Sequence, residues 1–178
     1  MGCRLSSVTF AATATLVGST SGYAVTYLSA EQAQAVLFPG VALTQVPRTL
    51  TASETNAIEK ASGLRVRVRA LRLWRAPDGS WFIVDEVLGK HEFITYAVAM
   101  TPDGAVRQIE ILDYRESYGD QVRNEKWRAQ FSGKTASDPL KLDEDIMNIS
   151  GATLSCRHVT DGVKRLLATH ALVLQSRR

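Results

Sequence analysis

The sequence predicts a single α+β domain in which helices pack against a four-stranded antiparallel sheet. Three observations favour this fold class. The 178 residues include 45% hydrophobic and 22% charged side chains, as expected for one globular domain with its own core. Apolar stretches in the middle of the chain are joined by short turns, including Pro-Asp-Gly twice, which is typical of an antiparallel meander. Helical periodicity occurs before and after these stretches, so helices and strands are segregated.

Two capping boxes predict the helices that precede the sheet. Ser29–Gln32 opens a short helix that runs to about Phe38, and Thr51–Glu54 opens a second that runs to about Ala61. In each box, a hydroxyl and a carboxamide or carboxylate three residues later accept hydrogen bonds from each other's backbone N–H groups. The segment between the two helices contains Pro47 and is expected to be a loop.

The predicted strands follow one another through short connections. They are Leu64–Ala70, Trp81–Val87, Phe93–Met100 and Val106–Leu112. The first alternates strictly, and its three arginines form a ridge opposite its apolar residues: Arg65, Arg67 and Arg69. A change of phase after this strand predicts a bulge near Ala70 or Leu71. A solvated face is the simplest interpretation of the arginine ridge, and docking of an acidic redox partner is the alternative.

Two further helices are expected after the sheet. Asp120 can cap one that runs to about Phe131. Trp127 and Phe131 are spaced as a core aromatic pair on this helix, with stacking on a cofactor as the alternative. The last helix follows residues 149–155, and its apolar side recurs at Val159, Val163, Leu166, Leu167 and Leu174.

Composition and spacing exclude several classes of function. The formal net charge is only +3, and the basic residues are dispersed, so a nucleic-acid tail or a polybasic membrane anchor is not indicated. His91, His158 and His170 lack the spacing of metal ligands. Neither a Gly-x-Ser-x-Gly motif nor a dinucleotide fingerprint occurs. A hydrolase that uses Ser150 or Ser155 would need a nearby base, which the scattered histidines do not supply.

The first 24 residues resemble a secretory signal peptide. Arg4 provides a thin positive start, a stretch of apolar and small residues follows, and Gly22-Tyr23-Ala24 fits a cleavage site. An uncleaved N-terminal anchor is the competing interpretation. The predicted division is therefore a signal peptide over residues 1–24 and one domain over residues 25–178. Cys156 is then the only cysteine of the exported part, which precludes an internal disulfide.

The start of the last helix is the most informative segment of the chain. Ile149–Ser155 is rich in small residues and hydroxyl groups and ends abruptly where helical periodicity begins. Gly151 and Ala152 would allow another group to approach the backbone closely. Two interpretations remain open from spacing alone: a hydroxyl caps the helix, or the unpaired N–H groups near Thr153 bind a phosphate.

Ser150-Gly151-Ala152-Thr153-Leu154-Ser155 resembles the Ser/Thr-Gly-Ala-Thr motif of FMN-binding domains. That family includes the periplasmic flavin-carrying subunits of the Rnf and sodium-pumping NADH:quinone reductase complexes. A flavin transferase esterifies the threonine of their motif through the FMN phosphate. The resemblance implies covalent FMN at Thr153, with a cradle formed by Ser150, Gly151, Ala152 and Ser155.

The resemblance extends over about the last 90 residues. Tyr114–Gly119 is similar to the Glu-Ser/Thr-x-Gly element of the family, which implies that Glu116, Ser117 and Gly119 lie near the flavin. The run from Trp127 to Lys134 is similar to the segment that joins the two motifs, and Lys134 can neutralise a phosphate as a point charge.

One position departs from the family pattern. The family usually carries an aspartate six residues before the flavin-bearing threonine, where this sequence has Met147. Noncovalent FMN therefore remains an open alternative.

These features predict an exported FMN-carrying electron-transfer protein, periplasmic or extracytoplasmic, without catalytic residues of its own. Its expected partners are a flavin transferase and a membrane electron-transfer protein, and nucleic acid is not expected. The alternative is a periplasmic binding or interaction module of the same fold with noncovalent flavin or none.

Overall fold

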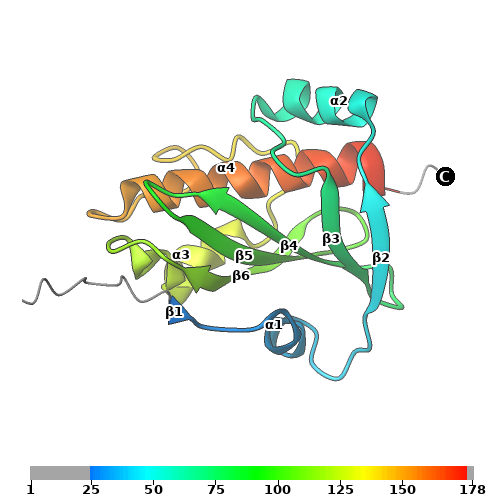
Figure 1. The fold of residues 1–178 in the computed structure, drawn as a ribbon, viewed down its shortest axis with the longest axis horizontal. Coiled ribbons are helices and arrows are strands. Elements are labelled where there is room, and N and C mark those ends of the chain that lie inside the picture. The colour runs from blue at the N-terminus through cyan, green and yellow to red at the C-terminus, as the bar shows by residue number, and fades with distance from the viewer. Residues whose placement is uncertain (1–24, 176–178) are drawn as a thin grey trace, which may run out of the picture.

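The computed structural model describes residues 25–175, and it describes the side chains from Tyr27 onward. The predicted signal peptide, residues 1–24, lies outside the described residues. The sheet is antiparallel and has the strand order β1-β6-β5-β4-β3-β2 (Figure 1). Its strands are β1 (Val25–Thr26), β2 (Thr44–Thr49), β3 (Ala70–Arg75), β4 (Trp81–Leu88), β5 (Phe93–Met100) and β6 (Val106–Tyr114).

The predicted fold class, a single-sheet α+β domain, is confirmed, but the predicted number of strands, four, is wrong. Five strands of six or more residues form the sheet, and the two-residue β1 adds a sixth. The predicted strand Leu64–Ala70 does not form, because β3 begins only at Ala70. The segment expected as a loop around Pro47 is β2. This strand lies at the sheet edge, where a proline costs no ladder hydrogen bond.

The helices before the sheet agree with their capping boxes. α1 (Ala30–Leu37) is capped by Ser29 and α2 (Ala52–Ser62) by Thr51. Gly63 ends α2 in the left-handed conformation.

The predicted helix from Asp120 to Phe131 is wrong as a single element. It is divided into the 3₁₀ turn η1 (Asp120–Arg123), the short helix α3 (Glu125–Arg128) and the 3₁₀ turn η2 (Ala129–Phe131). Asn124 breaks the run with extended backbone, and its side chain accepts hydrogen bonds from the N–H groups of Lys126 and Trp127. Asn124, and not Asp120, is therefore the side chain that caps this helix.

The two faces of the sheet are covered by different helices. α4 (Thr153–Thr169) lies along one face and α1 along the other, as Figure 1 shows. Alternation along β4 fits this arrangement, since Ile83 and Val87 belong to the core cluster under α4 and Phe82 and Val84 to the cluster under α1. A π-helical turn, η3 (His170–Leu174), continues α4.

α4 approaches the sheet closely at Gly162. A Cβ atom at this position would overlap the Tyr96 hydroxyl and lie 2.7 Å from Val87 Cγ1. The Tyr96 hydroxyl donates a 2.7 Å hydrogen bond to Asp85, whose carboxylate also pairs with Arg165 of α4 at 2.6 Å. This network fixes the position of α4 along the sheet, and with it the position of the helix start.

Trp127 and Phe131 are core residues. Their rings are almost fully buried and pack edge to face with centroids 5.1 Å apart. Between residues 25 and 175, no helix combines the length and the apolar character that crossing a membrane requires.

Candidate functional site

α4 begins without a side-chain cap. Ala152 occupies the N-cap position, and no side chain bonds the helix start there, whereas α1 and α2 both carry complete capping boxes. The interpretation of a Ser or Thr hydroxyl as the cap of α4 is therefore wrong. The first intrahelical hydrogen bond runs from the Cys156 N–H to the Ala152 carbonyl, so the preceding N–H groups of the first turn lack a helical partner. They lie at the positive end of the helix dipole.

A cavity of about 530 Å³ opens in front of this helix start. Three segments surround it: the turn between β4 and β5, the loop after β6, and the first turn of α4. Its lining residues are Lys90, His91, Glu116, Ser117, Tyr118, Gly151, Ala152, Thr153, Leu154 and Ser155. The structure thus brings the two sequence motifs, more than 30 positions apart in the chain, to one cavity.

Gly151 and Asn148 shape the approach to Thr153. Gly151 has a φ of +86°, which side chains disfavour, and no other atom lies within 4 Å of the position that its Cβ would take. The Asn148 side-chain amide donates a 3.0 Å hydrogen bond to Thr153 Oγ1. This bond orients the Thr153 hydroxyl at the cavity wall.

Ser155 ties the loop after β6 to α4. Its Oγ lies 2.7 Å from the Tyr114 hydroxyl, which donates its proton to the Tyr118 carbonyl at 2.5 Å. Ser155 is therefore the donor in its bond to Tyr114, since the single phenolic proton is already used. Burial raises the pKa of Tyr114 above its ordinary value, which keeps the phenol protonated.

Gly119 is required where this loop meets the helix. Its φ is +100°, and a Cβ would lie 2.5 Å from both Ser155 Oγ and the Tyr114 hydroxyl. Gly119 does not line the cavity; it allows the loop that carries Ser117 and Tyr118 to lie against α4.

Glu116 lines the cavity but uses its carboxylate to hold a turn. Its Oε1 accepts hydrogen bonds from the backbone N–H groups of His91 at 2.5 Å and Glu92 at 3.0 Å. Partial burial of the carboxyl would raise its pKa, but the hydrogen bonds from Glu92, His91 and Lys90 outweigh that effect and lower it. Glu116 is therefore ionised at neutral pH, and it fixes the turn that presents Lys90 and His91 to the cavity.

Besides Gly119, two other predicted site residues, Lys134 and Ser150, do not line the cavity. Lys134 pairs with Asp145 at 2.9 Å and lies 4.0 Å from Asp138, so its charge is compensated within the chain. Ser150 is exposed beside Gly151.

The structure also adds cavity residues that the motifs did not predict: Lys90, His91, Tyr118 and Leu154. Tyr118 and Leu154 could have been predicted from the sequence, because they lie inside the two motifs. Lys90 and His91 come from a turn between two strands, and only the packing of α4 on the sheet determines that this turn faces the helix start.

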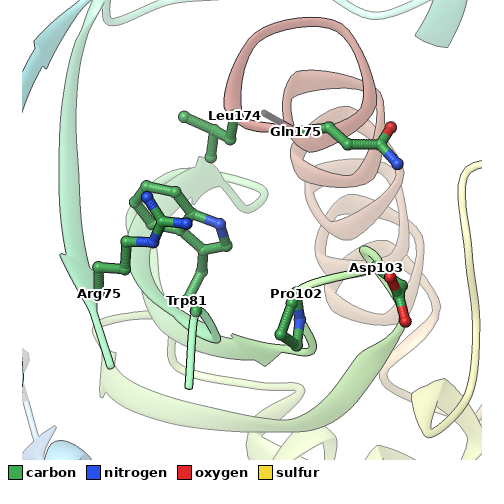
Figure 2. Close-up of a pocket in the computed structure, with 7 residues that line it drawn as sticks. Arg75, Trp81, Pro102, Asp103, Leu174 and Gln175 are labelled. Atoms are coloured by element: carbon green, nitrogen blue, oxygen red, sulfur yellow. The ribbon is translucent and has the colours of Figure 1, made fainter. Parts of the chain in front are cut away.

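A second cavity, of about 560 Å³, contains none of the predicted site residues. It lies near the carboxyl end of α4, between the two Pro-Asp-Gly turns and the end of η3, as Figure 2 shows. Its lining includes Trp81, Asp103 and Gln175, and the Arg75 guanidinium lies 5.1 Å from the centroid of the Trp81 ring. This cavity is therefore separate from the site at the start of α4.

Comparison with protein families identifies the part of the chain that contains the site. Residues 89–168 match the model of the FMN-binding domain family. This segment is therefore similar to an FMN-binding domain. The match begins at the turn that Glu116 holds and includes the whole of the cavity lining described above. No curated protein matches the chain.

FMN is the cofactor that the family match supports. The residues present fit such a ligand in two respects. The uncapped N–H groups at the start of α4 suit a phosphate, and a cavity of about 530 Å³ is within the range of ligand sites. Among residues 25–175, no group of three or more His, Cys, Asp and Glu side chains is placed to bind a metal ion.

Proposed function

We propose that this protein is an exported FMN carrier that transfers electrons between a membrane redox partner and a second acceptor. The observation that carries the proposal is the uncapped start of α4, which faces a cavity inside the segment that matches the FMN-binding domain family. Bound FMN would supply the redox chemistry, and the chain would supply position, charge and control of access.

The phosphate of FMN is proposed to lie at the first turn of α4. The N–H groups there have no side-chain acceptor, and Gly151 leaves the approach open. Lys90 brings a positive charge to the same cavity from the β4–β5 turn. Tyr118 and Leu154 are 87% and 42% exposed and offer apolar surface to the ring system at the cavity rim.

Thr153 is the proposed attachment point for covalent FMN. Its Oγ1 is at the cavity wall and accepts a hydrogen bond from Asn148, which leaves the hydroxyl proton free to be removed. Met147 holds the position at which the family usually carries an aspartate. Its side chain is 66% exposed, so a transferase that reads this position would meet a thioether in place of a carboxylate. Noncovalent FMN in the same cavity is the alternative form of the proposal.

The proposed partners are a flavin transferase and a membrane electron-transfer protein, and the proposed location is periplasmic or extracytoplasmic. Both follow from the signal-like residues 1–24 and from the resemblance of the two motifs to those of the flavin-carrying subunits. Nucleic acid is not a proposed partner, since the chain carries a net charge of only +3.

The deciding experiment is the intact mass of the protein after export from a host that has the flavin transferase. A covalent carrier gains the mass of one FMN less one water, and Thr153→Ala abolishes the gain. Ser150→Ala is the matched control, because this hydroxyl is three residues away and does not line the cavity. A gain that persists in Thr153→Ala would overturn the attachment point.

The same sample separates the remaining possibilities. An unmodified mass with a flavin absorbance spectrum means noncovalent FMN. An unmodified and colourless protein means a binding or interaction module of this fold without flavin, and overturns the proposed function.

A further inference from the structure

The sheet is split between β3 and β4. The two strands pair from Arg75–Trp81 to Arg72–Val84, and the pairing ends there. β4 continues to Leu88, whereas β3 continues towards Ala70 in contact with β2 alone. Residues 65–69 belong to no strand, and two cavities lie between this segment and β4 beyond Val84; we call this opening the wedge.

Both walls of the wedge carry free edges of backbone. Along β4, hydrogen bonding alternates between neighbours, and Gly89 bonds towards β5 through Glu92. Glu86 and Leu88 therefore direct their N–H and C=O groups into the wedge, as Phe82 and Val84 direct theirs to β3. On the opposite wall, Val68 and Ala70 likewise direct their backbone groups into the wedge, because the carbonyl of Arg69 between them accepts a hydrogen bond from Leu50 on the side of β2. Within residues 25–175, no backbone hydrogen bond closes the ladder beyond Val84.

The wedge is lined by apolar side chains. Two adjoining cavities, of about 310 Å³ and about 100 Å³, occupy it. Val68 and Phe93 line the larger one and are 52% and 42% exposed, which is unusual for large apolar residues that share one groove. Leu166 of α4 forms part of the floor of both cavities. An extended chain placed here would therefore find apolar contacts along one of its faces.

The rim of the wedge is positively charged. Arg67 lines the larger cavity, and Arg65 and Arg67 line the adjoining one that contains Glu86 and Leu88. Both belong to the arginine ridge predicted from the sequence, both are exposed, and neither forms an ion pair among the described residues, whereas Arg69, the third member, bonds to Leu50 on the β2 side. On the other wall, Asp85 is neutralised by Arg165, which leaves Glu86 as the single uncompensated acid in the lining. The charge of the rim therefore favours an acidic occupant.

We infer that the wedge between β3 and β4 binds an extended acidic segment of a partner protein as an added β-strand. Backbone hydrogen bonds to Glu86 and Leu88 supply the pairing, apolar side chains of the segment pack over Leu166, and its acidic side chains meet Arg65 and Arg67 at the rim. This is strand addition at an exposed sheet edge, in which main-chain bonds supply affinity and side-chain pockets supply specificity.

The wedge lies next to the proposed FMN site but does not depend on it. Gly89 lines a smaller cavity that also contains Arg65 and Arg67, and the neighbouring Lys90 lines the cavity in front of α4. A partner held in the wedge would therefore lie close to the β4–β5 turn.

The test uses two synthetic peptides of eight residues with blocked ends, one alternating Asp and Val and the other alternating Lys and Val. NMR titration of the purified protein should show binding of the acidic peptide about tenfold tighter than of the basic peptide. Amide hydrogen exchange of Glu86 and Leu88 should slow by about tenfold at saturation, because these N–H groups acquire acceptors.

Two exposed-site variants sharpen the test without endangering the fold. Arg65→Glu combined with Arg67→Glu should weaken the acidic peptide by about tenfold, and Val68→Glu should weaken it similarly. Lys126→Glu is the control for net charge, because Lys126 is exposed on α3 and forms no ion pair among the described residues.

Three results would overturn the inference. They are equal affinity for both peptides, protection of amides away from β4, and no binding of either peptide at millimolar concentration. Protection of Glu86 and Leu88 in the absence of peptide, together with a dimer in sedimentation, would instead assign the wedge to a second copy of the chain. None of these outcomes bears on flavin content, so this inference and the proposed function fail independently.

Discussion

Replacement of Gly119 by alanine tests whether the contact between the loop after β6 and α4 holds the site together. Two separate effects act at this position. The φ of +100° is unfavourable for alanine, by about 1–2 kcal/mol. The new Cβ would also lie 2.5 Å from Ser155 Oγ and the Tyr114 hydroxyl, so these groups must move apart. Such overpacking costs about 1–3 kcal/mol, and the lost hydrogen bond between them adds about 0.5–1.5 kcal/mol.

Gly133 provides the matched control. Its φ is +79°, and no atom lies within 4 Å of the position of its Cβ, so alanine there meets the backbone penalty alone. We expect the free energy of unfolding to fall by about 1–2 kcal/mol in Gly133→Ala. In Gly119→Ala it should fall by a further amount of about 1.5–4.5 kcal/mol, the sum of the packing and hydrogen-bond effects.

Urea unfolding of the ligand-free protein measures both variants. The midpoint multiplied by the slope gives the free energy, provided that the slope is unchanged. FMN binding is the second measurement: Gly119→Ala should weaken it, since Ser117 and Tyr118 move with the loop, and Gly133→Ala should leave it unaltered. Equal destabilisation by the two substitutions would refute the reasoning, because the contact with Ser155 and Tyr114 would then contribute nothing.

Three further predictions concern single positions. Met147→Asp should raise the fraction of protein that carries covalent FMN, as measured by intact mass; no change despite incomplete loading of the parent would show that the missing acid is not limiting. Glu116 has a lowered pKa, so its hold on the β4–β5 turn is complete above the ordinary glutamate value of about 4.3 and is lost as the pH falls through the lowered value. NMR shifts of the His91 and Glu92 amides should follow this loss on acidification, and Glu116→Gln should remove the response. Gly162→Ala should lower the thermal midpoint although alanine favours a helix by about 1 kcal/mol, because overlap with Tyr96 costs about 1–3 kcal/mol; a raised midpoint would contradict this.

The sequence predicted correctly those elements whose ends are set by interactions between residues close in the chain. The capping boxes at Ser29 and Thr51 gave α1 and α2 because their hydrogen bonds lie within four residues of chain. β5 was predicted with its observed ends, Phe93 and Met100, since a turn bounds each end.

The predicted strand Leu64–Ala70 failed because alternation does not distinguish pairing from packing. Val66 is half-buried against the cluster of Leu50 and Ile58, which produces an apolar face without a ladder. Its N–H donates to the Glu59 side chain on α2 at 2.9 Å, and the Arg69 side chain donates to the Leu50 carbonyl. Hydrogen bonds to α2 and to Leu50, which precedes α2, therefore hold this segment away from β4.

The candidate site was predicted in part. The two motifs indicated Glu116, Ser117 and Thr153, and the structure brings them to one cavity. The ion pair of Lys134 with Asp145 was not predicted, because Asp145 is eleven residues away in a loop whose path the sequence does not reveal. Lys90 and His91 escaped prediction for the same reason, since the contact between their turn and Glu116 spans more than 20 residues.

The uncapped start of α4 lowers the stability of the ligand-free protein but leaves N–H groups available to a phosphate. A serine or aspartate at position 152 could add about 1 kcal/mol of stability by capping the helix. The same side chain would occupy the N–H groups that a phosphate needs, and an aspartate would also repel it. Selection for a robust empty protein and selection for ligand retention therefore favour different residues at this position. If a phosphate binds at this helix start as proposed, alanine at 152 leaves the N–H groups of the first turn to it, and binding would then add to the stability of the folded protein.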